Sequence, residues 1–343
     1  MSQSAGKPGK GPFTVAQYVT GVRNGDRTML ARAITLFESL RPADRLLAQE
    51  VLTQILPGTG QAIRVGISGV PGVGKSTFIE SLGMMLTRQG QEVSVLAVDP
   101  SSAVSGGSIL GDKSRMPHLA ASPAAFIRPS PNALTAGGVG RRTRETMLLC
   151  EAAGFDVVIV ETVGVGQSET MVAEMVDFFM VLLLAGGGDE LQGIKKGILE
   201  LADLLAVNKA DGENRQRALT AQQEYRAALR YLPARSSTWQ APVLVVSGRT
   251  GDGLEEVWRQ VEEHRSVIVS NGQLERRRRE QNRQWMWSLI EERLKERFLT
   301  DSRIRQRLPE LESRVLAGSL TPTMAAEELL SLAAVPDEPI DSD

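Results

Sequence analysis

Between residue 62 and about residue 253, the hydrophobic positions form short, nearly continuous apolar runs, and segments with helical spacing separate them. Apolar runs of this length without polar alternation are typical of parallel strands covered by helices on both faces. The pattern therefore predicts an α/β fold with a mostly parallel sheet. The predicted strands are Ile63–Ser68, Val93–Val98, Ala125–Arg128, Val157–Glu161, Phe178–Leu184, Leu204–Asn208 and Val243–Ser247.

Regions with helical spacing flank this central domain. From Val15 to Ile55 apolar residues recur every three to four positions, and a long helix is predicted over Gly272–Phe298. Two shorter helices are expected over about Asp301–Ala317 and Pro322–Ala334. The predicted organisation is a disordered tail (1–12), an N-terminal helical extension (13–60), a central domain (61–268), a C-terminal helical region (269–335) that contributes to dimerisation, and an acidic tail (336–343).

The composition and charge of the chain argue against several classes of function. The net charge of −2 gives no reason to expect nucleic acid or an anionic membrane as a partner, and glutamates flank the arginine run 276–279. That run is predicted to lie on a solvated or inter-subunit face. One cysteine and two histidines exclude a disulfide framework and argue against a soft-metal site. The start of the chain lacks an apolar signal segment and no apolar stretch is long enough to span a bilayer, so the expected location is the cytoplasm or the equivalent compartment of an organelle.

The central motif, G-V-P-G-V-G-K-S-T, fits the phosphate-loop template G-x-x-x-x-G-K-[ST]. Its glycines let the main chain turn tightly and point several N–H groups inward, toward phosphate oxygens. It lies between a predicted strand and a predicted helix over Phe78–Leu86, which is the context that the template requires. The lysine is placed to reach the β- and γ-phosphates and the serine to ligate Mg²⁺. The residues predicted to bind the triphosphate are Gly69, Gly72, Val73, Gly74, Lys75, Ser76 and Thr77.

A second motif predicts which base is bound. Asn208, Lys209 and Asp211 fit N-K-x-D at a strand end, about 135 residues after the phosphate loop. A carboxylate at this place accepts hydrogen bonds from both N1–H and the N2 amino group of guanine, and adenine lacks that pair of donors. Ser247, Gly248 and Arg249 follow the next strand, where a main-chain N–H is expected to meet guanine O6. Together these residues predict GTP and GDP as the ligands.

Acidic residues at other strand ends are candidates for the metal site. Glu161 begins the segment Glu161–Gln167, in which the N–H of Gly164 is placed to sense the γ-phosphate. Asp99 follows another strand and Asp112 lies in the glycine-rich loop after it. Carboxylates at these places are suited to hold Mg²⁺ directly or through water. The predicted metal set is Ser76, Asp99, Asp112 and Glu161, and the predicted catalytic set is Lys75, Glu161 and Asp99.

Two glycine-rich stretches remain. The first, Gly186–Gly197, follows a fully apolar strand, and its three consecutive glycines would let it change shape with the nucleotide. A flexible surface turn is the competing interpretation. The second, Gly137–Arg142, is basic and is a weaker candidate for contact with an anion. The residues of the predicted switch are Gly186, Asp189, Glu190, Gln192, Lys195 and Lys196.

Five motifs of this chain resemble those of the MeaB/ArgK/MMAA family of P-loop GTPases. They are the phosphate loop G-V-P-G-V-G-K-S-T, V-D-P-S-S, E-T-V-G-V-G-Q-S-E, A-G-G-G-D-E-L-Q-G-I-K-K-G and N-K-A-D. The resemblance runs from about Gly21 to Phe298. It implies a GTPase of the signal-recognition-particle/MinD-like class that forms a homodimer mainly through its C-terminal part. It further implies a chaperone that gates adenosylcobalamin loading into methylmalonyl-CoA mutase and protects that enzyme. By the same resemblance Asp99, Asp112 and Glu161 match the Mg²⁺-site acids, and Gly186–Gly197 matches a third switch.

Other functions compete with this reading. A metallochaperone GTPase would share the fold but needs cysteine and histidine ligands. A kinase linked to amino-acid transport would need an acceptor site and a base near the γ-phosphate, and the sequence offers no clear one. Because Gln167 lies three residues beyond Gly164, it is not at the usual place of a water-orienting glutamine. The expectation is therefore slow hydrolysis alone and faster hydrolysis with a partner that completes the site.

Overall fold

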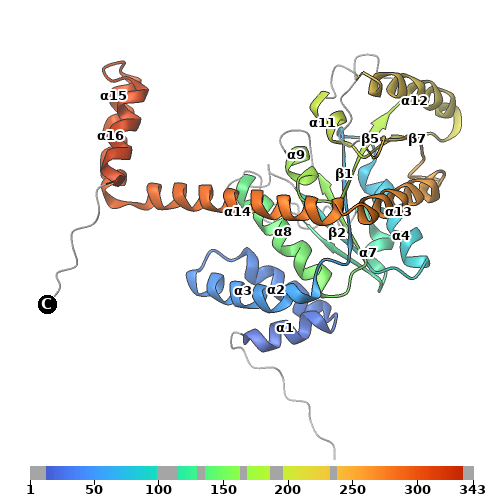
Figure 1. The fold of residues 1–343 in the computed structure, drawn as a ribbon, viewed down its shortest axis with the longest axis horizontal. Coiled ribbons are helices and arrows are strands. Elements are labelled where there is room, and N and C mark those ends of the chain that lie inside the picture. The colour runs from blue at the N-terminus through green and yellow to red at the C-terminus, as the bar shows by residue number, and fades with distance from the viewer. Residues whose placement is uncertain are drawn as a thin grey trace, which may run out of the picture. The chain divides into compact units, whose positions relative to one another are not determined.

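The computed structural model describes residues 13–98, 115–129, 136–162, 168–185, 196–231 and 238–334. The chain forms two compact units that divide between Gln281 and Asn282. The first unit contains a sheet of seven strands in the order β3-β2-β4-β1-β5-β6-β7, and every neighbouring pair is parallel (Figure 1). The strands are β1 (Ile63–Gly69), β2 (Val93–Val98), β3 (Ala125–Arg128), β4 (Val157–Thr162), β5 (Phe178–Leu184), β6 (Leu204–Asn208) and β7 (Val243–Val245).

These strands confirm the predicted α/β fold with a parallel sheet. The last strand is shorter than expected. The N–H of Val246 still donates to Val207, but the chain then turns over Ser247–Asp252, and the carbonyl of Gly248 accepts a hydrogen bond from Ser81. Helices cover both faces of the sheet, as the absence of polar alternation in the strands requires. The helices of the first unit are α1 (Val15–Arg23), α2 (Arg27–Glu38), α3 (Pro42–Ile55), α4 (Lys75–Arg88), α7 (Pro117–Ala121), α8 (Ala136–Ala152), α9 (Ser168–Ala173), α11 (Lys196–Leu201), α12 (Arg215–Leu229) and α13 (Leu254–Ser270), with short 3₁₀ turns at Leu56–Gly58 and Gly212–Asn214.

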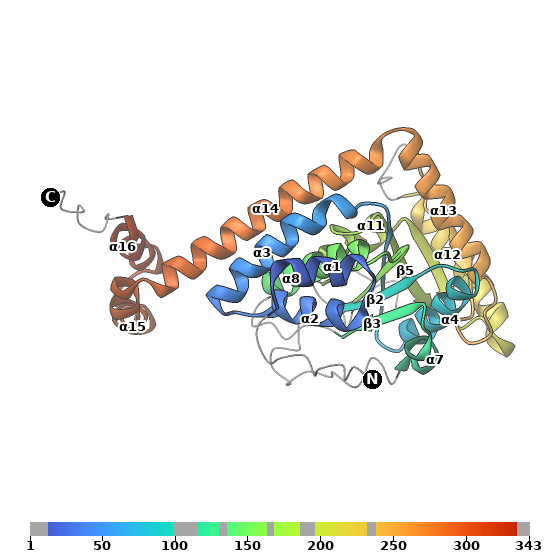
Figure 2. The same cartoon turned by 90° about the horizontal axis from the view of Figure 1, so that it is seen from below.

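Two hydrophobic clusters lie on the two faces of the sheet. One face packs against α4, α7 and α13, with Phe78 and Trp258 in that cluster. The other face packs against α8, α9 and α12, with Phe179 and Tyr225 in that cluster. Helices α1 to α3 pack on one another and on α8, so the N-terminal extension adds a further layer to this second face (Figure 2).

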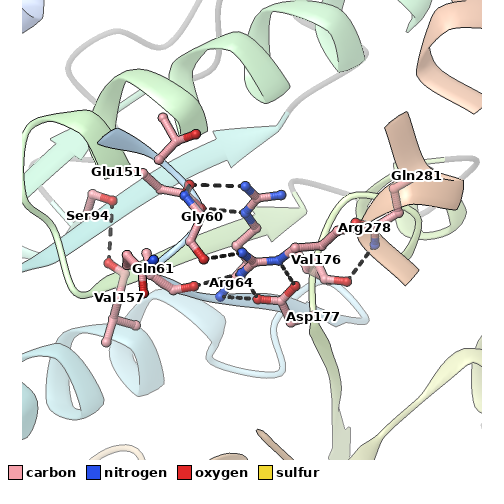
Figure 3. A network of polar contacts seen from close by, with 12 residues as sticks. Gly60, Gln61, Arg64, Ser94, Glu151, Val157, Val176, Asp177, Arg278 and Gln281 are labelled. Carbon is pink, nitrogen blue, oxygen red and sulfur yellow. Dashed lines mark hydrogen bonds and ion pairs between the residues drawn. The ribbon is translucent and has the colours of Figure 1, made fainter. Parts of the chain in front are cut away.

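Helix α14 (Gln273–Thr300) begins in the first unit, and its first turns correct one prediction. Of the arginine run 276–279, Arg276 and Arg279 are exposed, but Arg277 and Arg278 are turned into the protein. Arg278 pairs with Asp177 at 2.6 Å (Figure 3). Arg277 pairs with Asp203 at 3.4 Å. A solvated or inter-subunit face is therefore wrong for these two residues, because buried carboxylates at the amino ends of β5 and β6 attract them.

The second unit holds the rest of α14 together with α15 (Ser302–Leu316) and α16 (Pro322–Ala334). The last two helices pack on each other around a small core. On α14, Met286, Trp287, Ile290 and Leu294 are exposed in the single chain, and the tryptophan is 51% exposed. In the described part of the chain, none of the helices has the length and apolar character needed to cross a bilayer.

Candidate nucleotide-binding site

The phosphate loop joins the end of β1 to the start of α4, as the motif predicts. Gly72 and Gly74 adopt φ values of 80° and 94°, which side-chain-bearing residues rarely adopt. At Gly69 a Cβ atom would lie only 2.6 Å from the carbonyl oxygen of Leu182. Glycine is therefore required at these three positions for different reasons, two by backbone conformation and one by lack of space. Together the glycines let the main chain turn toward the N-terminus of α4. An N-terminus of this kind attracts phosphate groups.

Lys75 is the first residue of α4 and is largely buried beneath the loop. Its Nζ donates a hydrogen bond to the carbonyl oxygen of Gly69 at 2.7 Å. Burial lowers the pKa of the Lys75 ammonium, and the carboxylates of Glu161 and Glu169 oppose that shift by favouring the charged form. The ammonium thus lies against the carbonyl oxygens of Gly69 and Val70 at the start of the phosphate loop.

The next residue, Ser76, faces the end of β4. Its Oγ donates a hydrogen bond to Oε1 of Glu161 at 3.4 Å, and Glu161 is buried. The pairing of β1 with β4 places Glu161 beside Ile67, two residues before the phosphate loop. A hydroxyl and a carboxylate at this distance form an oxygen donor set that fits Mg²⁺, which is usually held by a few protein oxygens, phosphates and water. Thr77 follows in the first turn of the same helix.

Asn208 joins three parts of the site. Its Nδ2 donates a hydrogen bond to the carbonyl oxygen of Val73 at 2.9 Å, and its Oδ1 accepts one from the main-chain N–H of Gly248 at 2.9 Å. The side chain is buried, at 2% exposure. One amide thus connects the phosphate loop to the loop after β7. Gly248 also packs tightly against α4, since a Cβ atom there would lie 2.8 Å from Cα of Phe78.

The remaining residues of the predicted base site surround this amide. Asp211 accepts a hydrogen bond through Oδ1 from Oγ of Ser247 at 3.0 Å, and its other oxygen lies 3.9 Å from the exposed side chain of Arg249. Lys209 has a φ of 60°, and its Cε lies 3.7 Å from the Cβ position of Gly74. The structure therefore brings the N-K-x-D residues, the Ser247–Arg249 loop and the phosphate loop to one edge of the sheet, where ligands of open α/β folds bind.

Several predicted residues lie outside the described part of the chain. They are Asp99, Asp112, Gly164, Gly186, Asp189, Glu190, Gln192 and Lys195. Lys196, the last residue of the predicted switch, is the first residue of α11. The basic stretch 137–142 belongs to α8, and its Arg141 pairs with Glu145 of the same helix at 3.0 Å.

Two features of the site were not assigned from the sequence. Glu169, in the first turn of α9, is 2% exposed, and its negative charge favours the charged form of Lys75 by raising the pKa of that side chain. Thr162 and Ser68 are buried and share a hydrogen bond of 3.0 Å between Oγ1 and Oγ, which links the end of β4 to the start of the phosphate loop. The signal for Glu169 was its place in the motif E-T-V-G-V-G-Q-S-E. The signal for the hydroxyl pair was a polar residue at the end of each of two apolar strands.

Comparison with known proteins agrees with this geometry. The family model described as "Methylmalonyl Co-A mutase-associated GTPase MeaB" matches residues 30–303. A probable GTPase of Mycobacterium tuberculosis is 55% identical over 94% of this chain and 96% of its own length. The mitochondrial methylmalonic aciduria type A homolog of Mus musculus is 48% identical over 92% of this chain and 79% of its own length.

A solved structure, titled as a LAO/AO transport system kinase, superimposes with a TM-score of 0.75 at 38% identity. It covers 94% of this chain, and this chain covers 98% of it. The family model, the relatives and the arrangement of the nucleotide motifs agree. This chain belongs to the MeaB family of methylmalonyl-CoA mutase-associated GTPases.

Proposed function

We propose that this protein binds GTP and GDP with Mg²⁺, and hydrolyses GTP slowly alone and faster with a partner. The single observation that carries the assignment of one nucleotide site is the Asn208 amide, which connects Val73 of the phosphate loop to Gly248. Because that amide is buried and both of its bonds are 2.9 Å long, the elements proposed to hold base and phosphates are locked to each other. Asp211, held by Ser247, is the proposed acceptor for the guanine N1–H and N2 amino groups.

In the proposed reaction, a water oxygen attacks the γ-phosphorus of GTP while the bond to the β–γ bridging oxygen breaks. The products are GDP and phosphate, which keeps one proton of the water while the other proton is released to solvent. Lys75 and the N–H groups of the phosphate loop would offset the negative charge on the phosphates. Ser76 and Glu161 would hold Mg²⁺, with Asp99 and Asp112 as further candidates. When bound, the ion would supply charge to the β- and γ-phosphate oxygens. Gly164 is the proposed contact to the γ-phosphate.

The proposed partner is an adenosylcobalamin-dependent methylmalonyl-CoA mutase. Support comes from the family description, which names association with that enzyme, and from the name of the mouse relative. The chaperone would gate the loading of adenosylcobalamin and protect the mutase, with the stretch Gly186–Gly197 signalling which nucleotide is bound. A homodimer through the C-terminal helices is proposed, because α14 leaves several large apolar side chains exposed. The cytoplasm is the proposed location.

The alternatives receive less support from the described residues. A metallochaperone would need thiol or imidazole ligands, but Cys150 is buried with its pKa raised to about 12 by burial. His264 is also buried, with Phe178 and Trp239 at ring distances of 5.1 and 5.0 Å. His118, the other histidine, is exposed beside Glu80, so the chain offers one accessible imidazole rather than a set of ligands. A kinase is best tested by transfer of ³²P from labelled GTP to a candidate acceptor.

A hydrolysis assay tests the proposal directly. We would measure GTP and ATP turnover with and without purified methylmalonyl-CoA mutase, for the native protein and for Lys75→Ala. We expect GTP turnover that the mutase accelerates, weak or no ATP turnover, and loss of turnover in Lys75→Ala. Arg88→Ala, at the other end of the same helix, is the matched control and should behave as the native protein does. ATP turnover equal to GTP turnover would overturn the guanine assignment, and an unchanged rate with the mutase would overturn the partner.

A further inference from the structure

An open groove of about 1080 Å³ lies between the N-terminal helices and strand β3, which is an edge strand of the sheet. It is lined by α1, α2, the turn between α2 and α3, and the side chains of Phe126 and Arg128 on β3. Figure 2 shows α1 and α2 beside this edge of the sheet. The groove is lined by none of the residues assigned to the nucleotide, so the proposed GTP site does not account for it.

The charges in the groove are unequal. Four arginines line it, against two acidic residues, in a chain whose net charge is −2. Glu38 is paired with Arg128 at 2.5 Å, and Asp44 accepts a hydrogen bond from Ser39. Arg27 donates to the main-chain carbonyls of Pro123 and Ala125, which leaves its positive charge without a neutralising acid in these contacts.

The other two arginines lie at the open side of the groove. Arg32 places its guanidinium 4.7 Å from the ring centroid of Phe13, and Arg41 is exposed at the N-terminal end of α3. Together with Arg27 they give the groove three cations that are not paired with Glu38, against the one acid Asp44. A surface of this kind favours a ligand that carries several negative charges.

Apolar side chains lie within and beside the same groove. Phe13 and Phe126 line it and are half-buried. Leu40 is 59% exposed and lies in the chain between the lining residues Ser39 and Arg41. A free inorganic anion would use only the arginines and would fill little of a hollow of this size, whereas a polypeptide would also cover the aromatic rings and Leu40.

We propose that this groove, between the N-terminal extension and β3, binds a carboxylate-rich segment of a partner protein that also carries apolar side chains. The inference rests on the proposed function, under which that partner is methylmalonyl-CoA mutase. The N-terminal extension then has a role of its own, separate from nucleotide binding. Arg32 and Arg41 would contact the carboxylates, and Phe13 and Phe126 would contact the apolar side chains between them.

Binding of the whole mutase to the full chain tests the groove. We would measure the dissociation constant by calorimetry, with GDP and with a non-hydrolysable GTP analogue, at low and at physiological salt. The test variant is Arg32→Glu/Arg41→Glu, in which both positions are exposed. The matched control is Arg217→Glu/Arg230→Glu, which reverses two exposed arginines, one on α12 and one at its C-terminal cap, and changes the net charge equally. Thermal unfolding and GTP affinity of both variants would be measured alongside.

We expect the test variant to bind the mutase at least about tenfold more weakly at low salt and to lose much of the salt dependence, because rim charges act on association through screened fields. The control should stay within about threefold of the native protein. Poly-L-glutamate should compete with the mutase for the native protein more strongly than sodium phosphate at equal ionic strength.

Equal affinities of the native protein and the test variant for the mutase would overturn the proposal that the groove binds it. That result would not contradict the mutase as the partner. A mutase that fails to bind the native protein would instead overturn the proposed function. Competition by phosphate that equals that of poly-L-glutamate would overturn the assignment to a polypeptide segment.

Discussion

Arg278 and Asp177 form a bidentate ion pair, with Nε donating to Oδ1 at 2.9 Å and Nη2 donating to Oδ2 at 2.6 Å. Both side chains are largely buried, and Arg278 also donates to the carbonyls of Gly60 and Ala62 (Figure 3). Burial opposes ionisation of Asp177, but the bonds and charge of Arg278, with help from Arg64, lower its pKa below the ordinary value of 3.8. This pair fastens the start of α14 to the amino end of β5.

Arg278→Gln should therefore destabilise the first unit by about 3 kcal/mol near neutral pH, since it leaves Asp177 as a buried charge without its main partner. The contribution of the pair is present above the ordinary pKa of Asp177 and is lost as the pH falls through the lower folded-state pKa. The gap in unfolding free energy between native protein and variant should thus narrow on acidification. Urea denaturation at a series of pH values measures this gap.

Arg279→Gln is the matched control, because Arg279 is the exposed neighbour in the same helix. It should change the unfolding free energy by less than about 0.5 kcal/mol at any pH. Equal destabilisation by the two variants would mean that the ion pair contributes nothing of its own.

Asp211→Asn should change the base that is preferred. The carboxylate is oriented by Ser247, and loss of a charge-assisted pair with guanine should weaken GTP binding by about 1.5–3 kcal/mol. Xanthosine triphosphate should bind better than to the native protein, because its C2 carbonyl accepts a hydrogen bond from an amide. Calorimetric titration with GTP and with xanthosine triphosphate measures both changes in affinity. An unchanged affinity for GTP would remove Asp211 from the base site.

Glu161→Gln should reduce hydrolysis more than it reduces nucleotide binding. The change removes a negative charge beside Ser76 and Lys75, where the oxygen donors fit Mg²⁺. The loss should be partly relieved at high Mg²⁺, so turnover is measured across a Mg²⁺ titration. Glu145→Gln, a buried acid on α8 paired with Arg141, is the control for loss of a carboxylate elsewhere. Normal turnover with normal Mg²⁺ dependence would make Glu161 a structural residue.

The sequence predicted the sheet well because its strands are buried on both faces and therefore apolar throughout. Six of the predicted strands match the structure to within one residue, and Val243–Val245 is the shorter exception. The phosphate loop was predictable for a related reason. Gly72 and Gly74 are required by their main-chain φ values, which a local sequence pattern can reveal. Gly69 is required by the close approach of Leu182, but its fixed spacing from the other two glycines makes it visible in the motif.

Contacts between distant residues could not be predicted in the same way. Nothing in the order of residues shows that Arg278 lies against Asp177, which is 101 positions away, so a run of arginines flanked by glutamates reads as surface. The bridge from Asn208 to Val73 spans 135 positions, and only the motif made it foreseeable that the two loops would meet. Glu169 was missed because an acidic residue in the first turn of a helix usually serves the helix itself.

Lys195→Ala should uncouple the nucleotide from the partner. Lys195 belongs to the stretch Gly186–Gly197, most of which lies outside the described residues, and the prediction follows from its glycines and charges. GTP binding by the isolated variant should stay close to that of the native protein. The acceleration of hydrolysis by the mutase should fall by about 5- to 150-fold, the usual range of coupling between two sites. An unchanged acceleration would leave Lys195 as ordinary surface.

The most direct measurement is the rate at which the mutase acquires adenosylcobalamin in the presence of this protein. The rate would be followed by absorbance with GTP, with a non-hydrolysable GTP analogue and with GDP, and Lys75→Ala would serve as the control without bound triphosphate. If the nucleotide gates loading, the rate with GTP should differ from the rates with the analogue and with GDP, and Lys75→Ala should show no such difference. Equal loading rates under all three nucleotides would contradict a gating role.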